Sequence, residues 1–257
     1  MDYRRMHHDE LDRPEWDRPR PQRPVRRVVI CSTPRSGSYL LCRQMVNAGL
    51  GIPTEYLRAQ TRTALRTRWR DGAPGDAGYL DAVEEHRTTG NGVFAAKLQW
   101  RQCEQHPASR ERWLARADLL VFLLRDDLAA QAVSWQVSLA TGLWSFDDTR
   151  GPTESQVSLE PSSITHRLAR MLRQQNERWS ALLSELGRPV LVVRYETYVR
   201  AQGELLRDIA SRLGLRPDEW SMPPPEGRDN RLPADVEEAR ARLLDYVRGG
   251  AAGPTTR

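Results

Sequence analysis

Residues 26–49 read RRVVICSTPRSGSYLLCRQMVNAG, and the fold class follows from them. Val28, Val29 and Ile30 form an unbroken apolar run, which is typical of a strand buried on both faces of a parallel sheet. A polar turn comes next at 33–38. The apolar residues after it recur at helical spacing until Gly49, where we expect the helix to end. A strand, a polar turn and a helix in this order indicate an α/β fold.

The same alternation continues along the chain. We expect further strands at 93–100, 118–124 and 189–195, and further helices at 108–117, 126–142, 163–186, 201–213 and 234–248. Strands that alternate with helices predict one α/β domain over residues 25–248, with a mainly parallel central sheet and helices on both faces. Residues 1–24 mix Arg, acidic residues and Pro without periodicity, so we expect a disordered arm there and a disordered tail at 249–257.

Composition excludes several classes of protein. The 257 residues carry a formal net charge of +5, which is modest for a nucleic-acid binder, although the Arg-rich segment at 18–27 leaves that class as an alternative. Three scattered cysteines indicate neither a disulfide framework nor a zinc site, so no metal is expected. We expect a cytoplasmic protein without a membrane span, because no apolar stretch approaches the roughly 20 residues that a span needs and the N-terminus lacks an apolar signal segment.

The turn after the first predicted strand has the composition of a phosphate-binding loop. In open parallel sheets, ligands bind where such turns lead into helices, and a helix N-terminus favours negative charge. Ser36 and Ser38 offer hydroxyl donors, and Arg35 offers a fixed positive fork. The loop is not a Walker A motif, because GxxxxGK[ST] is absent. The alternative is a polar turn that binds nothing.

Several segments also resemble a known family. TPRSGSYLLC (33–42) is similar to the 5′-phosphosulfate loop of sulfotransferases that use 3′-phosphoadenosine-5′-phosphosulfate (PAPS). Five further segments resemble, in the same order, the bacterial trehalose 2-sulfotransferase family: GIPTEYL (51–57), FAAKLQW (94–100), LLRDDLAAQAVSWQ (123–136), ATGLW (140–144) and RYETY (194–198). The resemblance implies a P-loop-NTPase-like three-layer fold, PAPS as co-substrate, 3′-phosphoadenosine-5′-phosphate (PAP) as product, and a homodimer.

The resemblance also implies a role for individual residues. The 5′-phosphosulfate would be held by Arg35, Ser36, Gly37, Ser38 and Tyr39. Arg125 and Ser134 would hold the 3′-phosphate, and Tyr195 would contact the adenosine or belong to the core. The alternatives are an ion pair between Arg125 and Asp126 or Asp127, and a surface position for Ser134.

This sequence departs from the family pattern at two positions. Tyr39 stands where sulfotransferases often carry a small hydroxyl residue. Asp126 follows Arg125 where a second basic residue is common. Both departures bear on how the donor is held.

Sulfuryl transfer needs a base for the acceptor hydroxyl and positive charge for the leaving oxygen. Many animal sulfotransferases use a His in the strand that corresponds to FAAKLQW, and that His is missing here. The resemblance implies Glu55 as the general base, with a solvated loop glutamate as the alternative. Lys97, the only lysine of the chain, lies in an otherwise apolar strand. We expect it to stabilise charge together with Arg35, the alternative being a lysine that snorkels at a sheet edge.

The sequence therefore predicts a PAPS-dependent sulfotransferase that acts on a hydroxyl of a trehalose-like sugar or a glycosylated small molecule. Trp144 and Phe146, in the loop after the predicted helix 126–142, have the character of a sugar platform or of a dimer or core contact. Alternative acceptors are a nucleoside or another natural product. A nucleotide kinase or NTPase on the same fold is the alternative from another class.

Overall fold

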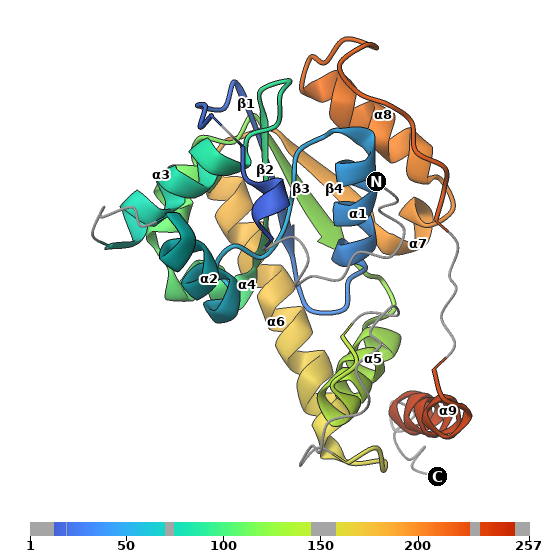
Figure 1. Ribbon diagram of the computed structural model, residues 1–257. Helices are drawn as coiled ribbons and strands as arrows, with labels where there is room; N and C mark the ends of the chain where they lie inside the picture. Colours follow the sequence, from blue (N-terminus) through green and yellow to red (C-terminus); the bar gives the residue numbers. More distant parts are fainter. Residues whose placement is uncertain (1–12, 19, 70–74, 145–157, 227–231, 250–257) are drawn as a thin grey trace.

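In the computed structural model, four parallel strands form the centre of the molecule (Figure 1). The structure describes residues 13–18, 20–69, 75–144, 158–226 and 232–249. The sheet has the order β2-β1-β3-β4, from β1 (Arg26–Ser32), β2 (Val93–Gln99), β3 (Leu119–Leu124) and β4 (Val190–Arg194). In the registers, Ser32 lies opposite Gln99 on one side and Leu123 on the other, so the strands end at nearly the same level.

Helices cover both faces of the sheet. Alternate residues of β1 enter separate cores, with Val29 and Cys31 on one face and Val28 and Ile30 on the other. The first core also contains side chains of α2 (Ala59–Trp69), α3 (Gly75–Arg87), α4 (Trp100–Gln105) and α6 (Ser163–Glu185). The second contains those of α1 (Ser38–Ala48) and α8 (Gln202–Arg212). This arrangement confirms the predicted α/β class.

Helices α5 (Leu128–Thr141) and α9 (Ala234–Gly249) and the N-terminal part of α6 lie beyond the carboxyl ends of the strands (Figure 1). Helix α5 packs on α6 through Ala132, and on α9 through Val133 and Val137. Asp127 caps α5 by accepting a hydrogen bond from the Ala130 amide at 2.9 Å. The carboxyl ends of the strands therefore point toward these packed helices.

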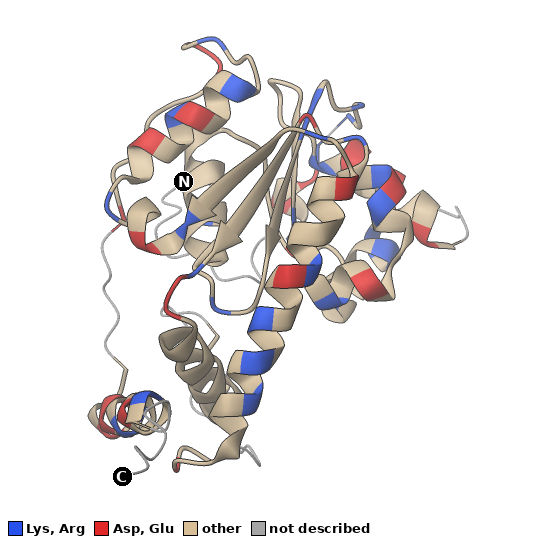
Figure 2. Cartoon of the chain, turned by 180° about the vertical axis from the view of Figure 1, so that it is seen from behind, with Lys and Arg blue, Asp and Glu red and all other residues tan. Residues whose placement is uncertain are grey.

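Charged residues lie mainly on the helices, while the strands are largely without charge (Figure 2). Lys97 is an exception, because it stands inside β2 and its side chain is only 2% exposed. No helix in the described part of the chain is long and apolar enough to cross a membrane. Within the same described ranges, no group of three or more His, Cys, Asp or Glu is arranged to hold a metal ion.

Three local expectations need correction. The predicted helix at 108–117 ends early, at residue 114, and its main part, Arg110–Leu114, is π-helical. The predicted buried strand β4 lies at the edge of the sheet, so Val192 is 52% exposed. Tyr195, expected at the end of that strand, begins the short helix α7 (Tyr195–Tyr198).

The predicted disordered arm also differs from what is observed after residue 12. Residues 14–16 form a 3₁₀ turn, and the amides of Arg18 and Gln22 donate to the carbonyls of His86 and Glu85. Composition alone indicated disorder, but these residues have partners far along the chain. Residues 1–12 and the tail at 250–257 lie outside the described residues.

Candidate active site

The predicted phosphate-binding loop joins β1 to α1 in a strained conformation. Arg35 has φ +62° and Gly37 has φ +87°. A Cβ atom at Gly37 would lie 2.3 Å from Cδ2 of Tyr195, so the tyrosine ring packs directly on the loop. Ser36 is fully buried, and its hydroxyl has no hydrogen-bond partner among the described residues. A buried hydroxyl without a partner at a helix N-terminus fits a loop that is completed by an anion.

A glutamine that the sequence analysis did not single out holds the base of this loop. Gln131 on α5 is fully buried, and its Nε2 donates to the Thr33 hydroxyl at 3.0 Å and to the Pro34 carbonyl at 2.7 Å. A polar residue on the buried side of a predicted helix was the available signal. Loop and helix are thereby fixed to each other.

Arg35 reaches from the loop to α5. Its Nε donates to the Ser134 hydroxyl at 3.0 Å, and its Nη1 donates to the Trp144 carbonyl. Ser134 therefore faces the loop rather than lying on an unrelated surface. Burial, and to a smaller extent the neighbouring Arg125 guanidinium, together lower the pKa of Arg35 to about 10. Two guanidinium groups close together favour the binding of an anion between or beside them.

Arg125 stands at the carboxyl end of β3, as the sequence predicts. Its guanidinium lies 4.9 Å from the centre of the Tyr195 ring, and its Nη1 donates to the Arg35 carbonyl at 3.4 Å. Its buried Nε has no hydrogen-bond partner among the described residues, and the nearest carboxylate in an ion pair, Glu196, is 4.0 Å away. Burial lowers the pKa of Arg125.

The two aspartates after Arg125 are paired with other arginines. Asp126 binds Arg194 at 2.6 Å, and Asp127 binds Arg248 at 2.7 Å. The alternative in which Arg125 pairs with one of these aspartates is therefore not what the structure contains. Arg194 also neutralises the acidic residue that departs from the family pattern. The other departure, Tyr39, lies beside Arg43, whose guanidinium is 5.0 Å from the ring centre.

Glu55 and Lys97 form a second cluster at the same edge of the sheet. Lys97 Nζ lies 2.7 Å from Glu55 Oε1, and the Lys97 amide donates to the Thr54 carbonyl at 3.0 Å. Lys97 is almost fully buried, so it does not snorkel into water. Glu55 is one-fifth exposed and is not a freely solvated loop residue.

Two glutamines that the sequence analysis did not assign hold the Glu55 carboxylate. Gln102 Nε2 donates to Glu55 Oε2 at 2.7 Å, and Gln99 Nε2 donates to Oε1 at 3.3 Å. Gln102 Oε1 in turn accepts the backbone N–H of Gln99 at 3.0 Å. Because a carboxylate only accepts, both amide nitrogens must face Glu55, which fixes both side-chain orientations. A glutamine three residues after a helix N-cap was the available sequence signal.

The candidate site thus lies at the carboxyl ends of three neighbouring strands. The phosphate-binding loop follows β1, Lys97 lies near the end of β2, and Arg125 follows β3. Trp144, from the proposed sugar platform, is 43% exposed, while Phe146 falls outside the described residues. This arrangement brings an anion cradle, a buried cation and a positioned carboxylate to one edge of the sheet.

Comparisons with known proteins place the chain among sulfotransferases. No curated protein matches it. A solved sulfotransferase domain from the Synechococcus PCC 7002 olefin synthase is 15% identical, with a TM-score of 0.43 over 91% of this chain and 98% of that one. A sulfotransferase structure from Alicyclobacillus acidocaldarius is 12% identical, with a TM-score of 0.39 over 88% and 96%. The model of the Stf0 sulphotransferase family matches residues 27–230, which contain both clusters and the whole sheet except Arg26, and the chain therefore belongs to this family.

Proposed function

We propose that this sulfotransferase moves the sulfuryl group of PAPS to a hydroxyl of a sugar or glycosylated small molecule, with Glu55 as general base. The contact between Glu55 and Lys97 carries the proposal. It places a proton acceptor 2.7 Å from a buried cation. Both groups lie near the carboxyl ends of the strands, where the predicted phosphate-binding loop begins.

The first cluster consists of the loop from Arg35 to Tyr39 together with Arg125, Ser134 and Tyr195. These residues fit a nucleotide that carries phosphate groups on both the 3′ and the 5′ oxygen of its ribose. The loop from Arg35 to Tyr39 would hold the 5′-phosphosulfate, with the Ser36 hydroxyl and the α1 N-terminus as donors. Arg125 and Ser134 would hold the 3′-phosphate, because the buried Arg125 Nε offers a donor. Tyr195, packed between Gly37 and Arg125, would contact the adenosine.

The second cluster supplies the acid–base chemistry. Bound PAPS provides an activated sulfuryl group whose transfer is an in-line displacement, which depends mostly on positioning and charge stabilisation. Glu55 accepts the proton of the acceptor hydroxyl while its two oxygens are held by Gln99 and Gln102. Lys97 and Arg35 stabilise the negative charge that passes to the leaving phosphate oxygen. The scheme needs no metal ion.

The acceptor class rests on the family resemblance, with trehalose as the first sugar to test and a nucleoside or other natural product as the next. The same resemblance is the ground for a homodimer, whereas the proposed cytoplasmic location rests on the sequence, in which no apolar stretch approaches the roughly 20 residues of a membrane span. We retain residues 25–248 as the proposed catalytic domain, with the contacts of residues 13–24 added to it.

The test is nucleotide binding by calorimetry with PAP, ADP and ATP–Mg²⁺. We expect PAP to bind at least tenfold more tightly than ADP, because only PAP carries the 3′-phosphate that Arg125 and Ser134 would contact. Equal affinities, or a preference for ATP–Mg²⁺, would remove the 3′-phosphate site and favour a kinase or NTPase. A preference for PAP leads directly to an acceptor screen that begins with trehalose.

A further inference from the structure

A short N-terminal segment binds one of the most deeply buried charges in the described structure. Arg87 on α3 is fully buried, and its Nη2 lies 2.9 Å from Asp17 Oδ1. Asp17 also accepts from the Trp69 indole N–H at 2.9 Å and pairs with Arg68 at 3.3 Å. Asp17 therefore ties the N-terminal segment to α2 and α3 through three side chains.

Arg87 contacts both Asp17 and Tyr56, the residue that follows Glu55. Its guanidinium lies 5.9 Å from the centre of the Tyr56 ring. The Tyr56 hydroxyl donates to the Ile52 carbonyl at 2.5 Å, and the Tyr79 hydroxyl donates to the Tyr56 carbonyl at 2.7 Å. The buried ring next to Glu55 thus closes the turn at 52–56 and rests against the cation that Asp17 neutralises.

Trp16 reaches the other end of the same turn. It packs on the buried side chain of Ile52, together with Val46 of α1. The pair Trp16 and Asp17, which we call the N-terminal clasp, therefore supports residues 52 and 56 from one side. On the other side, Thr54 is bound to the Lys97 amide. Glu55 lies between these supports.

We propose that Trp16 and Asp17 are positioning residues for Glu55, so that the N-terminal clasp is part of the catalytic apparatus. The inference rests on the proposed function, because it takes Glu55 as the base. Catalysis is sensitive to placement, since a shift of about 1 Å in a reacting group can lower the rate by about 100-fold. Loss of the clasp frees the turn without touching the donor loop.

Two truncations and two substitutions test this role. Removal of residues 1–12 should leave kcat within twofold, whereas removal of residues 1–18 should lower kcat by about 10- to 100-fold while PAP affinity stays within twofold. Asp17→Asn and Trp16→Ala should show the same separation of kcat from donor binding. Asp17→Glu should recover part of the loss. Asp17→Asn can unfold because it leaves Arg87 buried without a carboxylate. In that case the same measurements of kcat and PAP affinity are made on Trp16→Ala and on the double variant Asp17→Asn with Arg87→Met, and the same loss of kcat is expected.

The matched control is Glu84→Gln, which weakens another ion pair of α3. Glu84 is 6% exposed and binds Arg27 at 2.9 Å, so its ion-pair partner belongs to β1 and not to the turn at 52–56. We expect it to lower the melting temperature and to leave kcat within twofold at a temperature where the variant is folded. If Glu84→Gln and Asp17→Asn lower kcat equally, the clasp only stabilises α3 and the proposal is wrong.

A double-mutant cycle with Glu55→Gln separates this inference from the proposed function. If the clasp acts through Glu55, Asp17→Asn should change single-turnover rates by less than twofold in the Glu55→Gln background. Additive losses would overturn the clasp. Full activity of Glu55→Gln alone would instead overturn the assignment of the base, and that outcome is visible without any clasp variant.

Discussion

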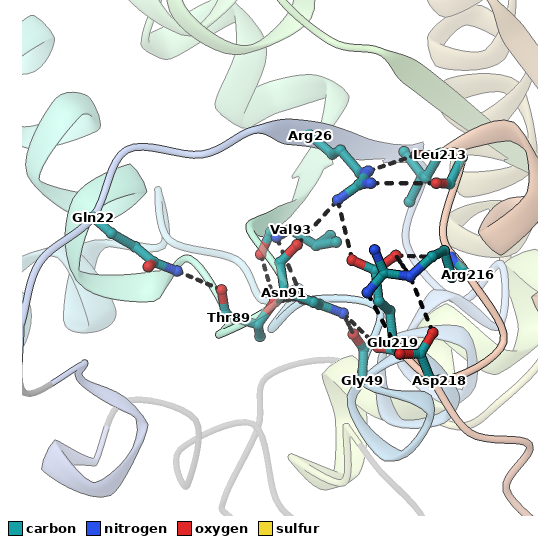
Figure 3. A network of polar contacts seen from close by, with 11 residues as sticks. Gln22, Arg26, Gly49, Thr89, Asn91, Val93, Leu213, Arg216, Asp218 and Glu219 are labelled. Atoms are coloured by element: carbon teal, nitrogen blue, oxygen red, sulfur yellow. Dashed lines mark hydrogen bonds and ion pairs between the residues drawn. The ribbon is translucent and has the colours of Figure 1, made fainter.

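Both ends of the sheet contain a largely buried arginine, but the two arginines differ in how fully their N–H groups are hydrogen-bonded. At the amino end, Arg26 donates to the carbonyls of Leu213, Asn91 and Gly214 at 2.7, 3.1 and 3.2 Å (Figure 3). At the carboxyl end, Arg125 has a buried Nε without a hydrogen-bond partner among the described residues.

The difference extends to the neighbours of each arginine. Asn91 donates both to the Gly49 carbonyl at 2.9 Å and to the Glu219 carbonyl at 2.8 Å, so the amino end is a closed network (Figure 3). The hydroxyls of Ser32 and Ser36, at the other end, are buried without partners in the described part of the chain. Unsatisfied buried groups lower stability, so these two hydroxyls are positions at which a ligand would complete the hydrogen bonding.

Two glutamates of similar burial, one at each end of the sheet, give the test with the largest expected effect. Glu55 at the carboxyl end is 20% exposed and Glu219 at the amino end is 17% exposed. Glu55→Gln should lower turnover by about 10²- to 10⁴-fold with PAP binding retained, because the amide cannot accept the proton. Glu219→Gln should leave turnover unchanged. Steady-state kinetics with saturating donor distinguish the two, and unchanged turnover in Glu55→Gln would remove it as the base.

The sequence predicts much of this arrangement, and its failures share one cause. The strands 26–32, 93–99 and 119–124 agree with their apolar runs, because burial on both faces leaves a strong local pattern. The pairing of Arg194 with Asp126, 68 positions away in the chain, leaves no such pattern. The contact of Asp17 with Arg87 is equally remote, and the Pro- and Arg-rich composition of residues 13–18 gave no indication of it.

The exposure of β4 was missed for the same reason. Its apolar run is as strong as that of an inner strand, and only the strand order places it at the edge. The composition of the phosphate-binding loop, by contrast, is local, and its glycine and hydroxyl residues were found directly. Whether these residues hold a donor stays a prediction.

The arginines of the two ends give the second test. Arg125→Ala should weaken PAP binding by about 10- to 100-fold and ADP binding much less, because a hydrogen bond to a charged group contributes about 1.5–3 kcal/mol. Its effect on stability should be smaller than that of Arg26→Ala, since the hydrogen bond from Arg125 Nη1 to the Arg35 carbonyl and the ion pair with Glu196 are long, at 3.4 and 4.0 Å. Arg26→Ala should lower the free energy of unfolding by about 1–3 kcal/mol, because it leaves three carbonyls without their donor, and PAP affinity should not change.

Calorimetry measures the PAP affinity of both variants, and chemical denaturation measures their free energies of unfolding. Equal weakening of PAP and ADP by Arg125→Ala would place Arg125 away from the 3′-phosphate. A loss of PAP affinity in Arg26→Ala would mean that the two ends are coupled through the sheet.

The smallest effect comes from two glycines with positive φ. Gly37 has φ +87° in the phosphate-binding loop, and Gly214 has φ +62° beside Arg26 at the amino end. Alanine in a left-handed conformation costs about 1–2 kcal/mol, so both Gly37→Ala and Gly214→Ala should lower stability by at least this amount. Only Gly37→Ala adds a methyl group 2.3 Å from the Tyr195 ring, whereas the space around Gly214 is open.

Tyr195 must therefore move in Gly37→Ala, and Arg125 loses the ring on which it rests. We expect PAP affinity to fall by about tenfold in this variant and to stay unchanged in Gly214→Ala, because one poorly placed charged contact is worth roughly that factor. Denaturation and calorimetry on the pair separate backbone strain, which the two glycines share, from displacement of Tyr195, which they do not. If both variants lose stability and neither loses affinity, Tyr195 is a packing residue and the donor is held without it.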